Sequence, residues 1–130
     1  MPEPIKKEQG DFMAHIVLEA YDPESGRIDS KRFANVLALS TQEMAQILDR
    51  TPRGITKNPT SPKLQNDMVR LMNLYQSLMG IFDGSTHYVR VWLRAPHPDL
   101  GGRTPLSLLE DGHPEVVESL LRAIETGQPG

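Results

Sequence analysis

Apolar and polar residues follow one another with a helical period in most of the chain. The clearest segment begins after Ser61-Pro62, where apolar residues recur every three or four positions until Asp83-Gly84. A Ser-Pro pair is typical of a helix start, and an Asp-Gly pair of a helix end. The pattern therefore predicts one long helix over residues 62–83 with a continuous buried face. Its apolar positions are Leu64, Met68, Leu71, Met72, Tyr75, Leu78, Met79 and Phe82.

The first 29 residues predict one helix between two irregular segments. Residues 1–10 hold two prolines, a glycine and several charged side chains, and we expect a disordered tail there. Asp11 is a suitable cap for a helix that runs to Tyr21 with apolar residues at helical spacing. Residues 22–26 then form a turn, because proline presets a negative φ and glycine accepts a positive one.

Three short helices are expected next, over residues 30–39, 41–49 and 52–58. Ser30 is a suitable cap for the first of them. Ser40, with Glu43 three positions later, forms a capping box that starts the second. Thr51-Pro52 combines a capping hydroxyl with proline at the first helical position, and Pro59 stops the third helix early. Three short helices with brief connections are typical of a helix-turn-helix.

The second half contains one segment that suits two kinds of element. Residues 86–94 are rich in β-branched and aromatic residues, which favours a strand, but their apolar spacing also suits a helix face. Residues 95–103 hold two prolines and two glycines and are expected to form a loop. Thr104-Pro105 and Pro114 open two further helices. The chain is therefore predicted to be all-α, with seven or eight helices.

Composition narrows the possible classes of function. The chain has 130 residues and a formal net charge of −3, so it is one domain or two small lobes and no basic coat protein. It contains no cysteine, which excludes a disulfide scaffold, a cysteine-ligated zinc site and a cysteine nucleophile. No apolar stretch approaches the roughly 20 residues of a membrane helix. The amino end lacks the apolar run of a signal peptide, so we expect a cytoplasmic protein without membrane contact.

No constellation of residues predicts catalysis. Four histidines are present, but none has a second ligand at the spacing of a known metal site. No serine lies in a nucleophile-elbow context, and the stretch Gly101-Gly102-Arg103-Thr104 lacks the full phosphate-loop pattern. We therefore expect no catalytic residue, no metal and no cofactor, and the protein is predicted to work by binding.

Residues 40–57 resemble the helix-turn-helix of Xre (Cro/repressor-like) DNA-binding proteins. The resemblance implies that the second helix of the motif presents its outward side chains to DNA. Between Arg50 and Arg70 the chain has five Lys or Arg residues and a single carboxylate, Asp67, which favours phosphate. The predicted DNA-binding residues are Thr51, Arg53, Gly54, Thr56, Lys57 and Lys63.

Two features favour instead a helical hairpin that packs without reading DNA. Asn58-Pro59 ends the second helix early and leaves few side chains for base edges. Asp49 stands where this family often has glycine at the turn, and aspartate tolerates left-handed geometry less well. Sequence-specific DNA binding and a packed hairpin both stay open at this point.

Residues 92–112 carry the more distinctive motif, Trp-Leu-Arg-Ala-Pro-His-Pro-Asp-Leu-Gly-Gly-Arg-Thr-Pro-Leu-Ser-Leu-Leu-Glu-Asp-Gly. Together with the last helix, residues 22–29 and the helix-turn-helix, this motif resembles the Xre/MbcA/ParS-like antitoxin family. The resemblance implies an antitoxin of a type II toxin–antitoxin pair whose partner is a RES-domain toxin that consumes NAD⁺. It also implies that the carboxy-terminal region covers the toxin's NAD⁺ site and that the protein often represses its own operon.

The chemistry of the motif suits a binding surface. Pro96 and Pro98 stiffen a loop, and Gly101 and Gly102 permit positive φ, so binding costs little ordering entropy. Residues 104–130 hold five carboxylates against Arg122, which suits a basic nucleotide cleft, although a solvated helix face is the ordinary alternative. Core anchoring is an alternative for Trp92, as is a pair within the fold for Arg103. The predicted toxin-binding residues are Trp92, Leu93, Pro98, Leu100, Gly101, Gly102, Arg103, Thr104, Glu125 and Gly127.

The sequence thus predicts an N-terminal Xre-like helix-turn-helix bundle joined by a long helix to a small helical toxin-binding domain. The expected division is a disordered tail at 1–10, a helical region at 11–60, and the connecting helix with the toxin-binding domain at 61–130. The expected partners are the toxin, own-operon DNA, and a second copy in a homodimer or in a hetero-oligomer with the toxin. The alternatives are a helix-turn-helix transcription regulator without a toxin partner and an interaction module whose helix-turn-helix no longer binds DNA.

Overall fold

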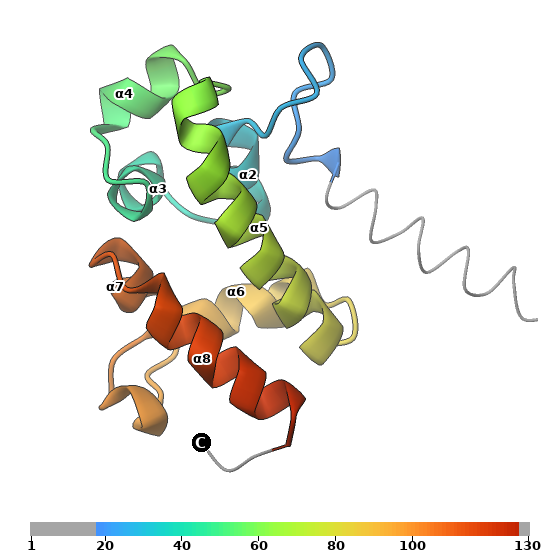
Figure 1. Cartoon of the computed structure of the whole chain (residues 1–130), viewed down its shortest axis with the longest axis vertical. Coiled ribbons are helices and arrows are strands. Elements are labelled where there is room, and N and C mark those ends of the chain that lie inside the picture. The colour runs from blue at the N-terminus through green and yellow to red at the C-terminus, as the bar shows by residue number, and fades with distance from the viewer. Residues whose placement is uncertain (1–17, 128–130) are drawn as a thin grey trace, which may run out of the picture.

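The computed structural model describes residues 18–127, which form seven α-helices and one 3₁₀ helix (Figure 1). The helices are α2 (Ser30–Leu37), α3 (Thr41–Ile47), α4 (Pro52–Lys57), α5 (Pro62–Ile81), α6 (Thr86–Arg94), the 3₁₀ helix η1 (Pro98–Leu100), α7 (Pro105–Glu110) and α8 (Pro114–Glu125). Extended pairing within residues 18–127 is limited to an isolated bridge between Tyr21 and Ile28. The prediction of an all-α fold is confirmed. The tail at 1–10 and most of the helix expected from Asp11 lie outside the described residues.

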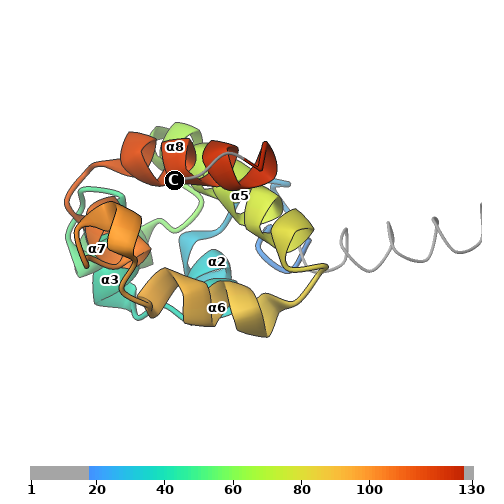
Figure 2. The same ribbon diagram turned by 90° about the horizontal axis from the view of Figure 1, so that it is seen from below.

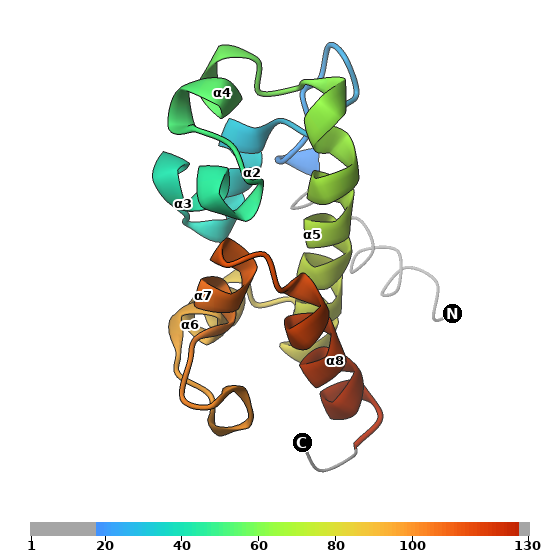
Figure 3. The same cartoon turned by 60° about the vertical axis from the view of Figure 1, so that its left-hand side comes forward.

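Helix α5 is the longest element and packs against both groups of shorter helices. In Figures 1 and 3, α2, α3 and α4 gather along its first half, whereas α6, α7 and α8 lie toward its other end. The predicted buried face of α5 is confirmed, except at Phe82, which caps the helix end and is half-buried. This face belongs to one core cluster that includes buried side chains from all the other described α-helices. The two groups of helices therefore share a single hydrophobic core.

Side-chain caps start the helices where the sequence predicts. Ser40 Oγ accepts the Glu43 N–H at 3.0 Å, and Glu43 Oε1 accepts the Ser40 N–H at 2.9 Å, which completes the capping box of α3. Thr51 Oγ1 accepts the Gly54 N–H at 3.0 Å, and proline follows at the first position of α4. The same arrangement of hydroxyl and proline recurs at the starts of α5 and α7. These bonds satisfy backbone donors that a helix N-terminus otherwise leaves free.

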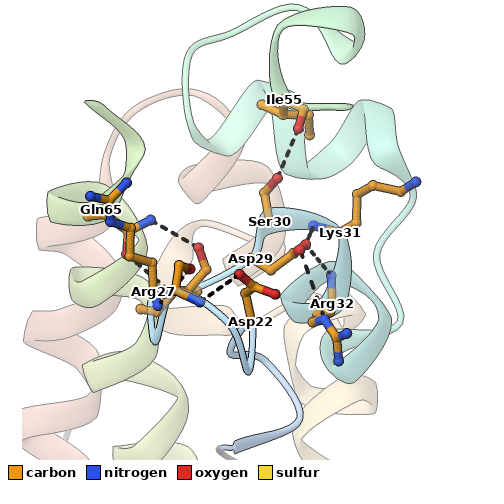
Figure 4. Close-up of polar contacts among 10 residues, drawn as sticks. Asp22, Arg27, Asp29, Ser30, Lys31, Arg32, Ile55 and Gln65 are labelled. Carbon is orange, nitrogen blue, oxygen red and sulfur yellow. Dashed lines mark hydrogen bonds and ion pairs between the residues drawn. The ribbon is translucent and has the colours of Figure 1, made fainter. Parts of the chain in front are cut away.

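Several helix boundaries differ from the prediction, and two of the differences lie around residues 21–30. The cap of α2 is Asp29 rather than Ser30, because the Asp29 carboxylate accepts two backbone N–H groups of the first turn at 2.9 and 3.0 Å (Figure 4). Ser30 is instead the first helical residue, and its buried hydroxyl donates to the Ile55 carbonyl at 3.2 Å, which joins α2 to α4. The helix expected to run to Tyr21 has ended before that residue, which forms the bridge to Ile28.

A side-chain amide fastens the segment before α2 to the long helix. Gln65 Oε1 accepts the Ile28 N–H at 3.0 Å, and Gln65 Nε2 donates to the Ile28 carbonyl at 2.9 Å (Figure 4). The amide thus satisfies both backbone groups of a buried residue that has no sheet around it. The preceding turn is closed by Asp22, whose carboxylate accepts the Ser25 N–H at 3.0 Å. The turn predicted at residues 22–26 is therefore confirmed.

Residues 86–94 form helix α6, which decides between the two elements that the sequence allowed. Ser85 Oγ accepts the Tyr88 N–H at 3.2 Å and caps the helix. Val89 and Leu93 lie one turn apart and are both buried in the core. Burial at helical spacing therefore outweighs the β-branched composition of this segment. The loop expected at residues 95–103 contains the short 3₁₀ helix η1.

Among residues 18–127, three non-glycine residues adopt the left-handed backbone conformation: Ala38, Asp49 and Asp83, with φ of 56°, 55° and 55°. Ala38 ends α2 earlier than the sequence predicts, and Asp83 follows the end of α5. An alanine in this region costs about 1 kcal/mol or more, because its Cβ approaches the following carbonyl oxygen. Ala38 is exposed, so no packing of its methyl group offsets that strain.

Replacement of Ala38 by glycine should therefore stabilise the protein. We expect Ala38→Gly to raise the free energy of unfolding by about 0.5–1 kcal/mol, because glycine adopts positive φ without the clash. Ala123, in the regular part of α8, is the matched control, and Ala123→Gly should lower the same quantity by about 1 kcal/mol. Urea unfolding of both variants measures the effect, and a loss of stability in Ala38→Gly contradicts the interpretation.

Candidate functional site

The residues predicted to bind DNA and those predicted to bind a toxin lie at opposite ends of the molecule. Helix α4 and the start of α5 occupy one end of the long axis in Figures 1 and 3. The loop that contains η1 and the end of α8 occupy the other end in both views. The two surfaces are therefore separated by the length of the core and can be described one at a time.

The first surface is the basic end of the molecule. Ile55 is the one residue of α4 that is buried, and it holds the helix against the core. Arg53, Lys57 and Lys63 form no ion pair with any carboxylate in residues 18–127, so their charges face solvent. The predicted DNA-binding residues Thr51, Arg53, Gly54, Thr56, Lys57 and Lys63 are all exposed.

Other charges of the basic segment are engaged within the fold. Arg70 donates to both oxygens of Glu118 on α8, at 2.9 and 2.7 Å. This fork raises the pKa of Arg70 and lowers the pKa of Glu118. The guanidinium of Arg50 donates to the Asp49 carbonyl at 3.0 Å. The positive surface at this end is therefore narrower than the count of basic residues indicates.

Helices α3 and α4 are short and are joined by a tight turn. Asp49 takes the left-handed conformation at the turn, although aspartate stands where the related motif often has glycine. Ala45 is buried where α3 and α4 cross, as its small side chain suggests. Helix α4 ends at Lys57 and is capped by Asn58, so the early stop expected from Pro59 is confirmed. Only six residues are helical in α4, which limits how many side chains reach a partner.

The second surface centres on a loop that its own backbone closes. The His97 N–H donates to the Arg103 carbonyl at 3.0 Å, and the Gly102 N–H donates to the His97 carbonyl at 3.0 Å. Gly101 and Gly102 have φ of 65° and 81°, which confirms the positive φ expected at this pair. The His97 ring accepts the Asp99 N–H at 3.2 Å and caps η1. The loop is therefore shaped before any partner binds.

The structure separates the predicted toxin-binding residues into exposed and buried ones. Leu93 and Leu100 are 2% and 8% exposed, so they hold the loop from within the core, and the expectation that they contact a partner directly is corrected. Trp92 is half-buried against the same core. Thr104 is half-buried as the cap of α7. The residues that face solvent are Pro98, Gly101, Gly102, Arg103, Glu125 and Gly127.

Several charges near this end form pairs within the fold. The guanidinium of Arg103 donates to the carboxylate of Asp111, which fixes the loop against the end of α7. Partial burial raises the pKa of Glu110, and the nearby carboxylates of Glu43 and Asp111 raise it further. Glu125, the last residue of α8, is exposed and makes no ion pair with a residue of 18–127.

Two arginines of α6 hold the end of α2, an arrangement that sequence reasoning missed. Arg90 Nε donates to the Val36 carbonyl at 3.0 Å, and Arg94 Nη2 donates to the Ala38 carbonyl at 3.0 Å. The last carbonyls of a helix have no partner in the helix and carry the negative end of its dipole. Guanidinium groups therefore stabilise this end of α2 and attach α6 to it.

Arg94 also pairs with Glu43 of α3. Its two terminal nitrogens donate to the two Glu43 oxygens at 2.8 Å each. This bidentate pair lowers the pKa of Glu43 from 4.5 to about 2, with a smaller contribution from its bond to the Ser40 N–H. Since Glu43 also closes the capping box, the same carboxylate links α6 to the start of α3. The spacing of Arg90 and Arg94 in the sequence is ordinary for a helix and does not indicate this arrangement.

The described part of the chain offers no metal centre, because residues 18–127 bring no three His, Asp or Glu side chains together. No helix within the same residues is long and apolar enough to cross a membrane. A polar hollow of about 310 Å³ between the α3–α4 turn and the end of α7 is open to solvent. These observations leave the two surfaces as the candidate sites.

One family model matches the second half of the chain. Residues 77–127 match a family described as the antitoxin Xre/MbcA/ParS C-terminal toxin-binding domain. The matched segment contains α6, α7 and α8, and the match agrees with the resemblance to Xre/MbcA/ParS-like antitoxins.

One solved structure shares the fold. A chain of the crystal structure of the M. tuberculosis MbcT–MbcA toxin–antitoxin complex matches with a TM-score of 0.56 and 23% sequence identity, over 75% of this chain and 91% of that chain. No curated protein matches the chain. The all-α arrangement is thus that of a chain from a toxin–antitoxin complex.

The Glu43–Arg94 pair should make stability depend on pH. We expect Glu43→Gln to lower the free energy of unfolding at neutral pH by about 1 kcal/mol, since solvent screens a partly exposed pair. The pKa of Glu43 is lower in the folded state, about 2, than its ordinary value of 4.5. The stabilisation is therefore fully present above pH 4.5 and is lost as the pH falls toward 2.

Urea unfolding of the wild type and Glu43→Gln, in steps from about pH 7 to about pH 2, measures this dependence. The difference between the two proteins should shrink across the acidic steps and vanish at the last. Glu24 is an exposed carboxylate in the 22–26 turn, and Glu24→Gln is the matched control that should change little at any pH. A difference that stays constant across the series contradicts the role of the charge.

Proposed function

We propose that this protein is an antitoxin that binds a RES-type, NAD⁺-consuming toxin in the cytoplasm and neutralises it by covering its active site. The match of residues 77–127 to a toxin-binding domain carries the proposal. The fold shared with a chain of the MbcT–MbcA toxin–antitoxin complex supports it. The proposed inhibition is by occupancy of the toxin rather than by catalysis.

The geometry of the second surface supports inhibition by occupancy. The η1 loop is closed by its own hydrogen bonds, so a partner does not have to order it. Glu125 and Gly127 lie at the end of α8, at the same end of the molecule as the loop (Figure 1). We propose that the loop docks on the toxin while this end reaches the NAD⁺ cleft, where a carboxylate competes with phosphate for basic side chains.

We propose repression of the protein's own operon as the second activity. The exposed and unpaired Arg53, Lys57 and Lys63 support phosphate contacts at the helix-turn-helix end. Since this end is opposite the η1 loop, DNA and toxin would bind at different ends of the molecule and would not compete for one surface. On this proposal residues 11–60 supply the DNA contacts and residues 61–130 the toxin contacts, and a homodimer or a hetero-oligomer with the toxin spans two half-sites.

The first test is inhibition of the toxin. We expect the protein encoded by the neighbouring gene to co-elute with this chain and to lose its NAD⁺ consumption. A chain that ends at Ile124 lacks the end of α8 and should still co-elute but no longer inhibit. Lys57→Ala changes the opposite end and should inhibit like the wild type. Full inhibition by the shortened chain rejects coverage of the active site by this end, and failure of the wild type to bind rejects the antitoxin assignment.

The second test is binding to the promoter of the protein's own operon as a function of salt. Arg53→Ala and Lys57→Ala should weaken binding and reduce the slope of log affinity against log salt by about one unit for each phosphate that is no longer neutralised. Arg122→Ala removes the same charge from α8, at the far end, and should leave the slope unchanged. Equal slopes in all variants favour the packed hairpin that does not read DNA.

A further inference from the structure

Helix α6 exposes an apolar stripe in which Trp92 is the one member among the predicted site residues, and the packing of the fold does not explain it. Tyr88 and Val91 are 59% and 51% exposed, which is high for large apolar side chains. Trp92 is half-buried and Ala95 follows one turn after Val91, so these four residues share one face of the helix. We call this set, Tyr88, Val91, Trp92 and Ala95, the α6 stripe.

The inner side of α6 already satisfies the needs of the fold. Val89 and Leu93 are buried in the core, and Arg90 and Arg94 bind α2 and α3. Stability therefore does not require apolar residues on the outer side, where a β-branched valine has lower helix propensity than a charged residue such as Glu or Lys. The outward position of Val91 thus lacks a structural reason within residues 18–127.

The aromatic members of the stripe have polar groups that the fold leaves available. The Tyr88 hydroxyl and the Trp92 indole N–H have no hydrogen-bond partner within residues 18–127. Tyr88 itself is steadied by the ring of Phe82, whose centroid lies 6.2 Å away. Rigid aromatic side chains with a free polar tip are typical of the anchor residues of protein interfaces.

The polar groups around the stripe narrow the kind of partner. Residues 84–98 contain no carboxylate, His87 is exposed, and the charges of Arg90 and Arg94 are engaged by α2 carbonyls and by Glu43. The stripe also runs into the η1 loop, because Ala95 is the residue that follows α6. An apolar cleft with carboxylate or carbonyl oxygens at its rim complements such a surface.

We propose that the α6 stripe is the apolar anchor by which the antitoxin docks on its toxin. This inference rests on the proposed function, and it extends the binding surface from the η1 loop to a helix that enters an apolar groove of the toxin. Tyr88 and Val91 provide the buried centre of the interface, and the Tyr88 hydroxyl and the Trp92 N–H bond to acceptors at the groove. Leu93 contributes only by holding α6 to the core.

Val91→Glu and Tyr88→Ala test the stripe. Each should weaken binding to the purified product of the neighbouring gene at least about tenfold, because anchor residues dominate interface affinity. Val69 on α5 and Val116 on α8 are exposed by 46% and 39% and are matched controls for the same change. Helix α8 lies on the opposite side of the molecule from α6 (Figure 2), so Val116→Glu reports on another face of the same domain. Both control variants should bind within about threefold of the wild type.

Before the toxin-binding test, the unfolding temperature and the promoter-DNA binding of each variant are compared with those of the wild type, and both should be unchanged. Wild-type binding with unchanged binding by Val91→Glu overturns the inference but leaves the proposed function intact. A loss in Val116→Glu instead of Val91→Glu overturns it and moves the interface to α8. A change of oligomeric state in Val91→Glu, with toxin affinity unchanged, overturns it in favour of a second copy on the stripe. Absence of binding by the wild type rejects the proposed function together with this inference.

Discussion

The arrangement of the whole molecule depends on how the carbonyl groups at the end of α2 are satisfied. A helix leaves its last carbonyls without partners inside the helix, and the residue that caps α2 is Ala38 rather than a glycine. Arg90 and Arg94 reach them from α6, and Arg94 continues to Glu43 at the start of α3. Helix α6, which lies within the matched segment 77–127, thus binds the end of α2 and the start of α3. The shared core around α5 is the apolar counterpart of these polar bonds.

Elements with local start and stop signals could be predicted from the sequence. A capping hydroxyl followed by proline fixes the first turn of α4, α5 and α7 within a few residues of chain, so no distant partner is needed. The buried face of α5 could be predicted for the same reason, because its apolar residues recur at helical spacing along one continuous segment. The positive φ of Gly101 and Gly102 is another feature that the local sequence predicts. The family resemblance of the second half also depended on a contiguous motif.

Features set by long-range contacts could not be predicted in the same way. The type of α6 was undecided because β-branched content and helical spacing conflict until the core on which Val89 and Leu93 pack is known. Leu93 and Leu100 lie in the motif beside residues that face solvent, and only the fold shows that their side chains turn inward. Asp29 and Ser30 are both good caps, and the deciding contact of Ser30 is with Ile55, 25 positions away. The count of charges likewise missed that Arg70 is neutralised by Glu118.

The shared core has a consequence for the lifetime of the protein. Helix α5 supplies buried side chains to both groups of helices, so a cellular protease that engages and unfolds either group removes the support of the other. We therefore expect the surface around α4 and the surface around η1 to be lost together rather than one after the other. On this expectation degradation leaves no long-lived fragment that keeps one of the two surfaces, and the concentration of intact chains sets the amount of both.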